Sequence, residues 1–348
     1  MHNVRVSYSS VTRFRTCQQS YYYSNVLGIR RVDKAPQLEL GTIVHAYLQR
    51  YYTELKNGTS ASAAHQAGMT LIQTDFTSQL AQYRDLAFAA GNEDLAKRFD
   101  SMMRLAQMIC TRYFSVRGLR DASEYTFLMV EEPVIATISP TITSLSILDL
   151  VTESQSGLQL WEHKTAESIP GQDRRLRDLQ TLLFAKVGAM VLGREFDGVV
   201  WNYARTKEPA VPDLLKSGQL SRRKDLDTTW GVYRSTIVRH GLDEGDYQDV
   251  YMRLHNAEQD RFFPRYELPI LQQDEILIAD YIRTAESIQE ERFQWESGRR
   301  TPIRNVGFQC DFCEYALLCK TVILGGDEDD VIKLRFTSKE EVSTVGRN

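Results

Sequence analysis

Residues 143–164 have the sequence TSLSILDLVTESQSGLQLWEHK, in which two mainly apolar runs flank the turn-forming residues 154–157. Alternation of side-chain character along such runs is typical of half-buried strands. The Ser-Gln-Ser-Gly connection predicts an antiparallel hairpin with strands Thr143–Glu153 and Leu158–Lys164. If the turn closes symmetrically on residues 155 and 156, the numbers of paired residues sum to 311, and Asp149 lies directly opposite Glu162.

The predicted hairpin brings two acidic side chains together. Alternation puts Glu162 and Lys164 on one face of the strand and His163 on the other. Directly opposed residues have Cβ atoms about 4.5–5.5 Å apart, where two like charges destabilise the sheet. A divalent cation between Asp149 and Glu162 would reverse the sign of that interaction. The alternative is an exposed strand end with two solvated acids.

The segments around the hairpin continue the sheet. Tyr125–Ile138 has a strand pattern, and Gly198–Tyr203 is another apolar strand. Between the hairpin and the latter strand, apolar residues at three- and four-residue spacing predict a helix over about Gln172–Leu192. Strand, helix and strand form a crossover unit, so we expect an α/β fold with a mixed central β-sheet flanked by helices.

Three of the five cysteines fall within ten residues, in Cys310-Asp-Phe-Cys313-Glu-Tyr-Ala-Leu-Leu-Cys319. Three local thiolates are one short of the four that a zinc ion or an iron–sulfur cluster needs. Cys17, in a helix predicted over Ser10–Tyr23, is the natural fourth. Cys110 lies in an apolar helical stretch and is expected in the core. The spacing alone does not distinguish zinc from iron–sulfur.

Composition excludes several classes of protein. The chain has 348 residues, 42% of them hydrophobic and 25% charged, which is typical of a globular protein with a real core. No apolar run reaches about 18 residues, which excludes a transmembrane span. The first residues, MHNVRVSYSS, lack the apolar segment of a signal peptide, so we expect a cytoplasmic protein.

The net charge of −4 gives no overall basic footprint for nucleic acid. Basic residues nevertheless form local clusters, whose positive charge is cancelled by acidic residues elsewhere when the net charge is counted. The aromatic run Tyr21–Tyr23, near Arg30, would suit base stacking on a single strand. The basic clusters are Arg30-Arg31, Arg174-Arg175 with Arg177, Arg222-Arg223-Lys224, and Arg299-Arg300 with Arg304.

Together these features resemble the PD-(D/E)XK nuclease superfamily. The closest resemblance is to its RecB-like branch with an iron–sulfur cluster, which includes CRISPR-associated adaptation nucleases and many phage exonucleases. Gly41-Thr-Ile-Val-His45 matches the Gly-x3-His motif of the family. Asp149 stands at its central metal-binding aspartate, and Glu162-His-Lys164-Thr165 matches its (D/E)-x-K-T motif.

Further along the chain, Gln180 matches the glutamine of a Gln-x3-Tyr motif, although the tyrosine is Phe184 here. The cysteine trio matches the closing Cys-x2-Cys-x5-Cys of the family's cluster. The family's usual proline after the first cysteine is Gln18. These departures remove no catalytic element, and the resemblance spans nearly the whole chain.

The resemblance implies metal-dependent hydrolysis of a phosphodiester. Asp149, Glu162 and His45 would hold Mg²⁺ or Mn²⁺. Lys164 would orient or deprotonate the nucleophile and stabilise developing negative charge. Gln180 would position the attacking water or the substrate backbone.

The resemblance also implies a 4Fe–4S cluster at the four cysteines, with zinc as the alternative. Such a cluster would act as a C-terminal staple that ties both ends of the chain to a restriction-endonuclease-like core. It would have an architectural role, as closed four-thiolate sites do. The ligands would be Cys17, Cys310, Cys313 and Cys319.

The expected function is that of a metal-dependent deoxyribonuclease. The favoured form is an exonuclease acting on single strands or DNA ends in recombination, repair or phage replication, with a helicase or recombination protein as a candidate partner. The alternative is a catalytically silent DNA-binding or scaffold subunit of a helicase–nuclease or recombination complex. An RNA-directed or endonucleolytic variant also stays open.

The expected organisation has six parts, each defined by a change of sequence pattern. They are residues 1–59 with Cys17 and the His45 helix, 60–120 as a helical cap, 121–205 as the nuclease core, 206–265 as an insertion, 266–320 as a C-terminal helix with the cysteine trio, and 321–348 as a mobile acidic tail.

Overall fold

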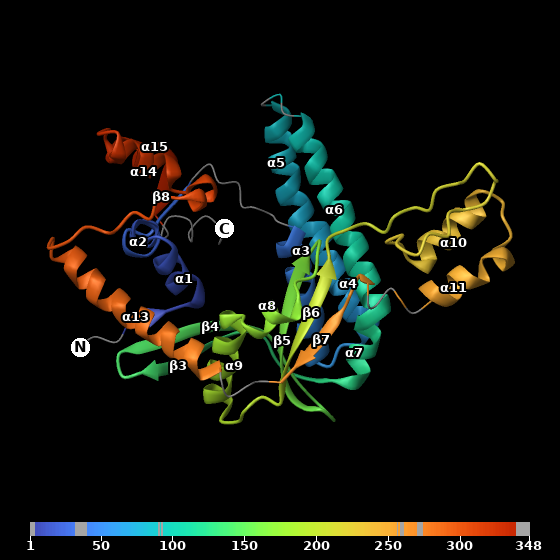
Figure 1. Ribbon diagram of the computed structural model, residues 1–348, viewed down its shortest axis with the longest axis horizontal. Coiled ribbons are helices and arrows are strands. Elements are labelled where there is room, and N and C mark those ends of the chain that lie inside the picture. The colour runs from blue at the N-terminus through green and yellow to red at the C-terminus, as the bar shows by residue number, and fades with distance from the viewer. Residues whose placement is uncertain are drawn as a thin grey trace.

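The computed structural model describes residues 4–31, 40–89, 91, 93–255, 257, 261–269 and 274–338. It confirms an α/β fold built on a mixed six-stranded sheet (Figure 1). Neighbouring strands follow the order β1-β4-β5-β6-β7, and β3 also pairs with β4. The strands are β1 (Val4–Val6), β3 (Thr126–Ser139), β4 (Ile142–Ser154), β5 (Gly157–Ala166), β6 (Gly198–Arg205) and β7 (Arg265–Leu268). Strands β1 and β7, which the sequence analysis placed outside the core, therefore extend the sheet.

The β4–β5 hairpin has the predicted register. Leu150 pairs with Trp161 and Ser154 with Gly157, so paired numbers sum to 311. The hydrogen-bonded ladder between β4 and β5 ends at the Leu150–Trp161 pair, one step before Asp149 and Glu162. Beyond that pair, β5 continues beside the parallel strand β6. Because β3 occupies one edge of β4 along most of its length, β1 and β5 share the other edge. Along that edge, residues 145–149 lie between the stretches that pair with β1 and β5.

Helices cover both faces of the sheet. Alternation along β5 and β6 sends Leu160 and Trp201 into a core with α1 (Tyr8–Thr16), α9 (Leu179–Leu192) and α13 (Asp274–Glu296). It sends Trp161 and Val200 into a second core on the opposite face. Burial on both faces explains why these strands read as nearly continuous apolar runs. The second core is completed by α3 (Leu40–Lys56), α4 (Ala61–Leu71) and α6 (Glu93–Tyr113).

Two helices predicted as continuous are interrupted. The helix expected over 172–192 consists of α8 (Gln172–Leu176) and α9. Asp178 caps α9 by accepting the backbone N–H of Thr181 at 3.0 Å, which starts a new helix there. The helix expected over 10–23 breaks at Cys17, whose extended backbone separates α1 from α2 (Gln18–Tyr21). A π-helical turn, Tyr22–Val26, follows α2.

Two structural units project from the central sheet. The described residues from 61 to 124 are helical apart from residue 91, and α5 (Thr77–Ala89) with α6 projects beyond the sheet in Figure 1. A π-helical turn at Ile72–Phe76 joins α4 to α5, and another at Phe114–Gly118 joins α6 to α7 (Leu119–Glu124). The described residues from 206 to 255 form a lobe at the right of Figure 1, with α10 (Trp230–Arg239), a 3₁₀ turn at Glu244–Tyr247 and α11 (Gln248–Leu254) around a small core of their own.

The C-terminal segment packs beside the N-terminal helices (Figure 1). It contains a 3₁₀ turn (Phe308–Phe312), α14 (Ala316–Ile323) and α15 (Glu328–Arg335), and β8 (Phe336–Ser338) pairs with β2 (Ile29–Arg31). The prediction of a mobile tail is therefore wrong for residues 328–338. The acidic run forms a helix start, because Asp327 accepts the N–H of Asp329 and negative charge is favourable at that end. Residues 339–348 lie outside the described part.

The helices that the structure describes are all too short or too polar to span a membrane.

Candidate active site

Three potential metal ligands converge from three elements. His45 on α3, Glu131 on β3 and Asp149 on β4 each offer one ligand atom, and these atoms all lie within 4.8 Å of one another. His45 Nδ1 is 3.9 Å from Glu131 Oε1. The backbone N–H of His163 donates to Asp149 Oδ2 at 2.8 Å and orients that carboxylate. Two carboxylates with one imidazole form a donor set suited to Mg²⁺ or Mn²⁺.

Gly41 determines where His45 lies. A Cβ atom at Gly41 would be 2.7 Å from Thr165 Oγ1, so a larger residue would force α3 away from β5. His45 lies four residues later, on the same face of the helix. Gly41 of the Gly-x3-His pattern and Thr165, which follows Lys164, therefore lie close together.

Glu131 is the site residue that the sequence analysis missed. It has φ 48°, the one positive φ outside glycine among the described residues. Its neighbours Val130 and Glu132 pair with Leu150 and Leu148, which places Glu131 opposite Asp149 by count. An acid inside an apolar strand was a usable signal, but it required the β3–β4 register. A positive φ in a bulky residue is strained and tends to occur at functional sites.

Glu162 is completely buried beside this trio. Its Oε2 accepts from Lys164 Nζ at 2.7 Å, whereas Oε1 is buried without a hydrogen-bond partner. Burial raises the pKa of Glu162 to about 7, Lys164 opposes the rise, and Asp149 adds to it. A buried acceptor oxygen with no donor, close to a second carboxylate, is an arrangement that a cation would stabilise. Glu162 does not belong to the group within 4.8 Å, where Glu131 takes the place expected for it.

The remaining charges of the site are mutually dependent. Burial raises the pKa of Asp149. His45 opposes this rise and Glu131 adds to it, so the pKa of Asp149 lies above its ordinary value. Burial lowers the pKa of His45, but Glu131 and Asp149 raise it above its ordinary value. Burial also lowers the pKa of Lys164, while Glu162 more than compensates. The site thus concentrates carboxylates whose ionised forms need a compensating positive charge.

A cavity of about 450 Å³ opens over Asp149. Its floor includes Leu145, Ser146 and Ile147, the part of β4 between the stretches paired with β1 and β5. Gln180 and Phe184, the predicted Gln-x3-Tyr positions, line the same cavity. The start of α9 after Asp178 is what directs Gln180 toward it. The structure therefore brings Gln180 together with Asp149 and Glu131.

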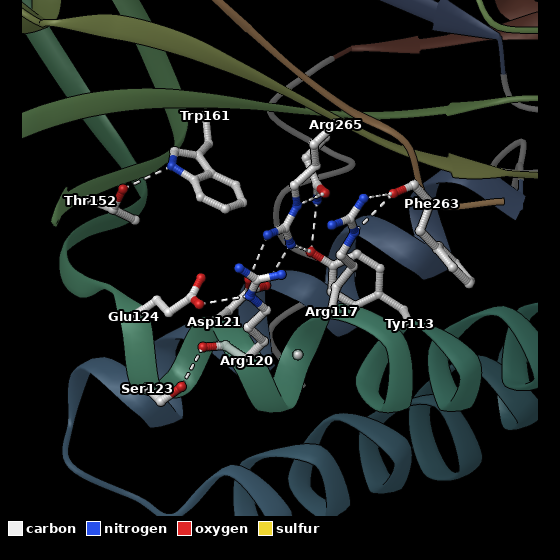
Figure 2. Close-up of polar contacts among 12 residues, drawn as sticks. Tyr113, Arg117, Arg120, Asp121, Ser123, Glu124, Thr152, Trp161, Phe263 and Arg265 are labelled. Carbon is white, nitrogen blue, oxygen red and sulfur yellow. Dashed lines mark hydrogen bonds and ion pairs between the residues drawn. The ribbon is translucent and has the colours of Figure 1, made fainter. Parts of the chain in front are cut away.

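A buried polar network supports β5 from the opposite face (Figure 2). Arg265 on β7 makes two hydrogen bonds to Asp121 on α7, at 2.5 and 2.6 Å, and one to Tyr113 at 2.9 Å. Arg265 Nε also donates to Asn202 Oδ1 at 2.8 Å, and Asn202 Nδ2 lies 2.9 Å from His163 Nδ1. The network therefore links the helical cap to the residue between Glu162 and Lys164.

The four predicted cluster cysteines line one cavity of about 330 Å³. Cys17 lies at the break between α1 and α2, and Cys310, Cys313 and Cys319 come from the C-terminal segment. Among the described residues, no three cysteine sulfurs lie within 4.8 Å of one another. Cys110 is fully buried in the core, as predicted.

Protein contacts also join the two ends of the chain at this cavity. Arg13 pairs with Glu314 at 2.7 Å, and the Gln19 N–H donates to the Ile303 carbonyl at 3.1 Å. Asn305 Nδ2 donates to the Thr16 carbonyl at 2.9 Å.

Several residues proposed for DNA contact have other roles. Tyr21 and Tyr23 are buried, so the prediction that they stack on bases is wrong. Arg175 is buried as well, and its guanidinium lies 3.8 Å from the ring centre of Tyr266. In the 222–224 cluster the two arginines form ion pairs within the lobe, Arg222 with Asp249 and Arg223 with Asp225.

The family model described as the PD-(D/E)XK nuclease superfamily matches residues 5–320 of the chain. A search of the curated proteins finds no significant match.

Proposed function

The chain belongs to the PD-(D/E)XK nuclease superfamily, and we propose that it is a metal-dependent deoxyribonuclease whose active site contains His45, Glu131, Asp149, Glu162, Lys164 and Gln180. The observation that carries this proposal is the convergence of an imidazole and two carboxylates beside a buried carboxylate that has one unpaired oxygen. A bound water molecule would not require this set of imidazole and carboxylate donors, whereas Mg²⁺ or Mn²⁺ would use them as ligands.

His45, Glu131 and Asp149 would hold the metal ion, and the free Oε1 of Glu162 would face it. A divalent ion there supplies Lewis acidity toward the phosphate and lowers the pKa of bound water. Lys164 stays protonated through its contact with Glu162 and would stabilise negative charge on the attacked phosphate. Gln180, at the start of α9, would orient the substrate over Asp149.

For the substrate, we propose single-stranded DNA or DNA ends, cleaved exonucleolytically in recombination, repair or phage replication. The cavity over Asp149 continues into a second cavity beside the cysteines, which suits an extended strand. A helicase or recombination protein would be a fitting partner.

For the four cysteines, we propose a 4Fe–4S cluster. A tetrahedral zinc site with Zn–S bonds of about 2.3 Å holds its sulfurs about 3.8 Å apart. Among the described residues, no three of these cysteine sulfurs lie within 4.8 Å of one another, and the four cysteines line one cavity. A cubane cluster, which places four metal ions between the thiolates, accommodates such spacing better.

The nuclease proposal is tested by digestion of labelled single- and double-stranded DNA with Mg²⁺ or Mn²⁺. Glu162→Ala and Lys164→Ala should each lose at least about 100-fold in rate, the scale of removing one group that stabilises the transition state. Glu153→Ala is the control, because Glu153 lies on the same hairpin but pairs with Arg194 at the surface.

Unchanged rates in both site variants would overturn the catalytic assignment. If the wild type binds DNA but cleaves neither substrate, the alternative of a catalytically silent DNA-binding or scaffold subunit takes its place.

A further inference from the structure

Two cavities of the molecule form one groove. The cavity over Asp149 and a larger one of about 580 Å³ share Tyr8, Ser9 and Gln180 in their walls. The larger cavity continues along α1 past Thr12 to the cysteine segment. Phe312 also lines the larger cavity, and its side chain is 86% exposed.

The cavity over Asp149 carries the carboxylates of Glu131 and Asp149, whereas the wall of the larger cavity includes uncharged polar groups. Hydroxyl and amide groups from Ser9, Thr12 and Gln180 line it. Its one arginine, Arg13, is paired with Glu314 at 2.7 Å, so the two charges largely cancel. Such groups form hydrogen bonds to phosphate and sugar without contributing net charge.

An exposed phenylalanine in the wall of a groove can stack on an aromatic ring of a bound ligand. Bases of a single strand present free faces, and a base stacked on an aromatic side chain contributes about 1–3 kcal/mol without sequence preference. Bases inside a duplex are already stacked on their neighbours. With Tyr21 and Tyr23 buried and Tyr8 only partly exposed, Phe312 is the most exposed ring in the wall of the larger cavity.

We propose that the groove from Asp149 to Phe312 is a binding channel for single-stranded nucleic acid, in which Phe312 stacks on a base remote from the cleaved phosphate. This proposal rests on the proposed nuclease function and specifies its substrate. Because the groove has no excess of positive charge, binding through it depends on stacking and hydrogen bonds more than on release of counterions.

The test is fluorescence anisotropy of labelled oligothymidylate twelve nucleotides long, in EDTA so that hydrolysis does not occur. Phe312→Ala should raise Kd about 5- to 100-fold, the range of one lost stack, and Phe312→Trp should retain the wild-type Kd. Phe308→Ala is the matched control, since Phe308 lies on the same 3₁₀ turn and is 82% exposed but does not line the groove. The slope of log Kd against log salt concentration should be the same in Phe312→Ala and wild type.

Hydrolysis of bis(p-nitrophenyl) phosphate with Mn²⁺ separates this inference from the proposed function. The wild type should cleave this small ester, which does not extend along the groove. If Phe312→Ala binds the oligonucleotide as tightly as wild type, the channel is overturned while the nuclease proposal stands. If the wild type cleaves neither the ester nor DNA, the nuclease proposal fails, and the binding measurement still decides the channel.

Discussion

At the scale of single residues, the site is defined by carboxylates that are unfavourable without a metal ion. Glu131 has a strained backbone, Glu162 is buried with an unpaired oxygen, and Asp149 has a raised pKa. Each feature costs stability in the metal-free chain. Together they indicate that the site is built to bind a ligand rather than to stabilise the fold.

Glu131→Gln should weaken Mn²⁺ binding about 10- to 100-fold, because one of three clustered ligands loses its charge. The measurement is isothermal titration with Mn²⁺. Glu132→Gln is the control, since the neighbouring acid pairs with Lys56 and lies outside the trio. Equal affinities for the two variants would contradict the role of Glu131.

The raised pKa of Glu162 predicts a pH dependence of stability in the metal-free protein. Its folded-state pKa of about 7 lies above the ordinary 4.5, so its contribution to stability is complete below about pH 4.5 and is lost as the pH rises through 7. In EDTA, wild type should therefore lose thermal stability between about pH 4.5 and pH 7, and Glu162→Gln should lose less.

Circular dichroism melts across that pH range provide the measurement, with Glu153→Gln as the control on the same hairpin. Parallel curves for wild type and Glu162→Gln would show that the carboxyl is not protonated in the folded state. Mn²⁺ should remove the loss at pH 8, because it binds the ionised carboxylate.

At the scale of elements, the site depends on how helices meet the sheet. Gly41 lets α3 approach β5, Asp178 restarts the helix that carries Gln180, and β5 departs from β4 after Trp161 to open the cavity. The Arg265–Asp121 network joins α6, α7, β6 and β7 behind β5. These contacts hold β5 from the face opposite the cavity.

Removing one partner of this buried pair should be costly. Arg265→Met or Asp121→Asn should lower the free energy of unfolding by about 3–5 kcal/mol, because each leaves its partner buried and unpaired. Urea denaturation measures the change. Arg120→Met, which breaks the exposed pair with Glu124 next to the network in Figure 2, should cost no more than about 1 kcal/mol. Similar losses for the buried and exposed arginines would contradict this account.

At the scale of the whole molecule, the two ends of the chain meet at the cysteine cavity. The β2–β8 pair, the Arg13–Glu314 ion pair and the hydrogen bonds to Ile303 hold residues near 17 against residues near 310. A cluster at this place would close a loop of nearly the full chain. Constraining so long a loop reduces the entropy of the unfolded state.

Cys310→Ser should lose the iron and the visible absorbance of the anaerobically purified protein and should lower its melting temperature. Cys110→Ala is the control, because Cys110 is buried in a separate core, and it should keep a full complement of iron. Elemental analysis with absorbance spectroscopy provides the measurement. A colourless wild-type protein with stoichiometric zinc would contradict the iron–sulfur proposal.

The sequence by itself determined the β4–β5 register, the crossover to β6, the mixed sheet with helices on both faces and the burial of Cys110. These features follow from alternation, helical period and turn chemistry, which act between residues close in the chain. It also indicated His45, Asp149, Glu162, Lys164 and Gln180 as one group through their motifs.

Only the tertiary structure decided which side chains are accessible and which acids meet. It buried Tyr21, Tyr23 and Arg175, exposed Phe312, and brought Glu131 to Asp149 through a positive φ. Local patterns do not predict these outcomes, because side-chain burial and the backbone at Glu131 depend on segments that are separated in the chain and pack together. That packing, which joins α1 to the C-terminal segment, is also what turns two cavities into one groove.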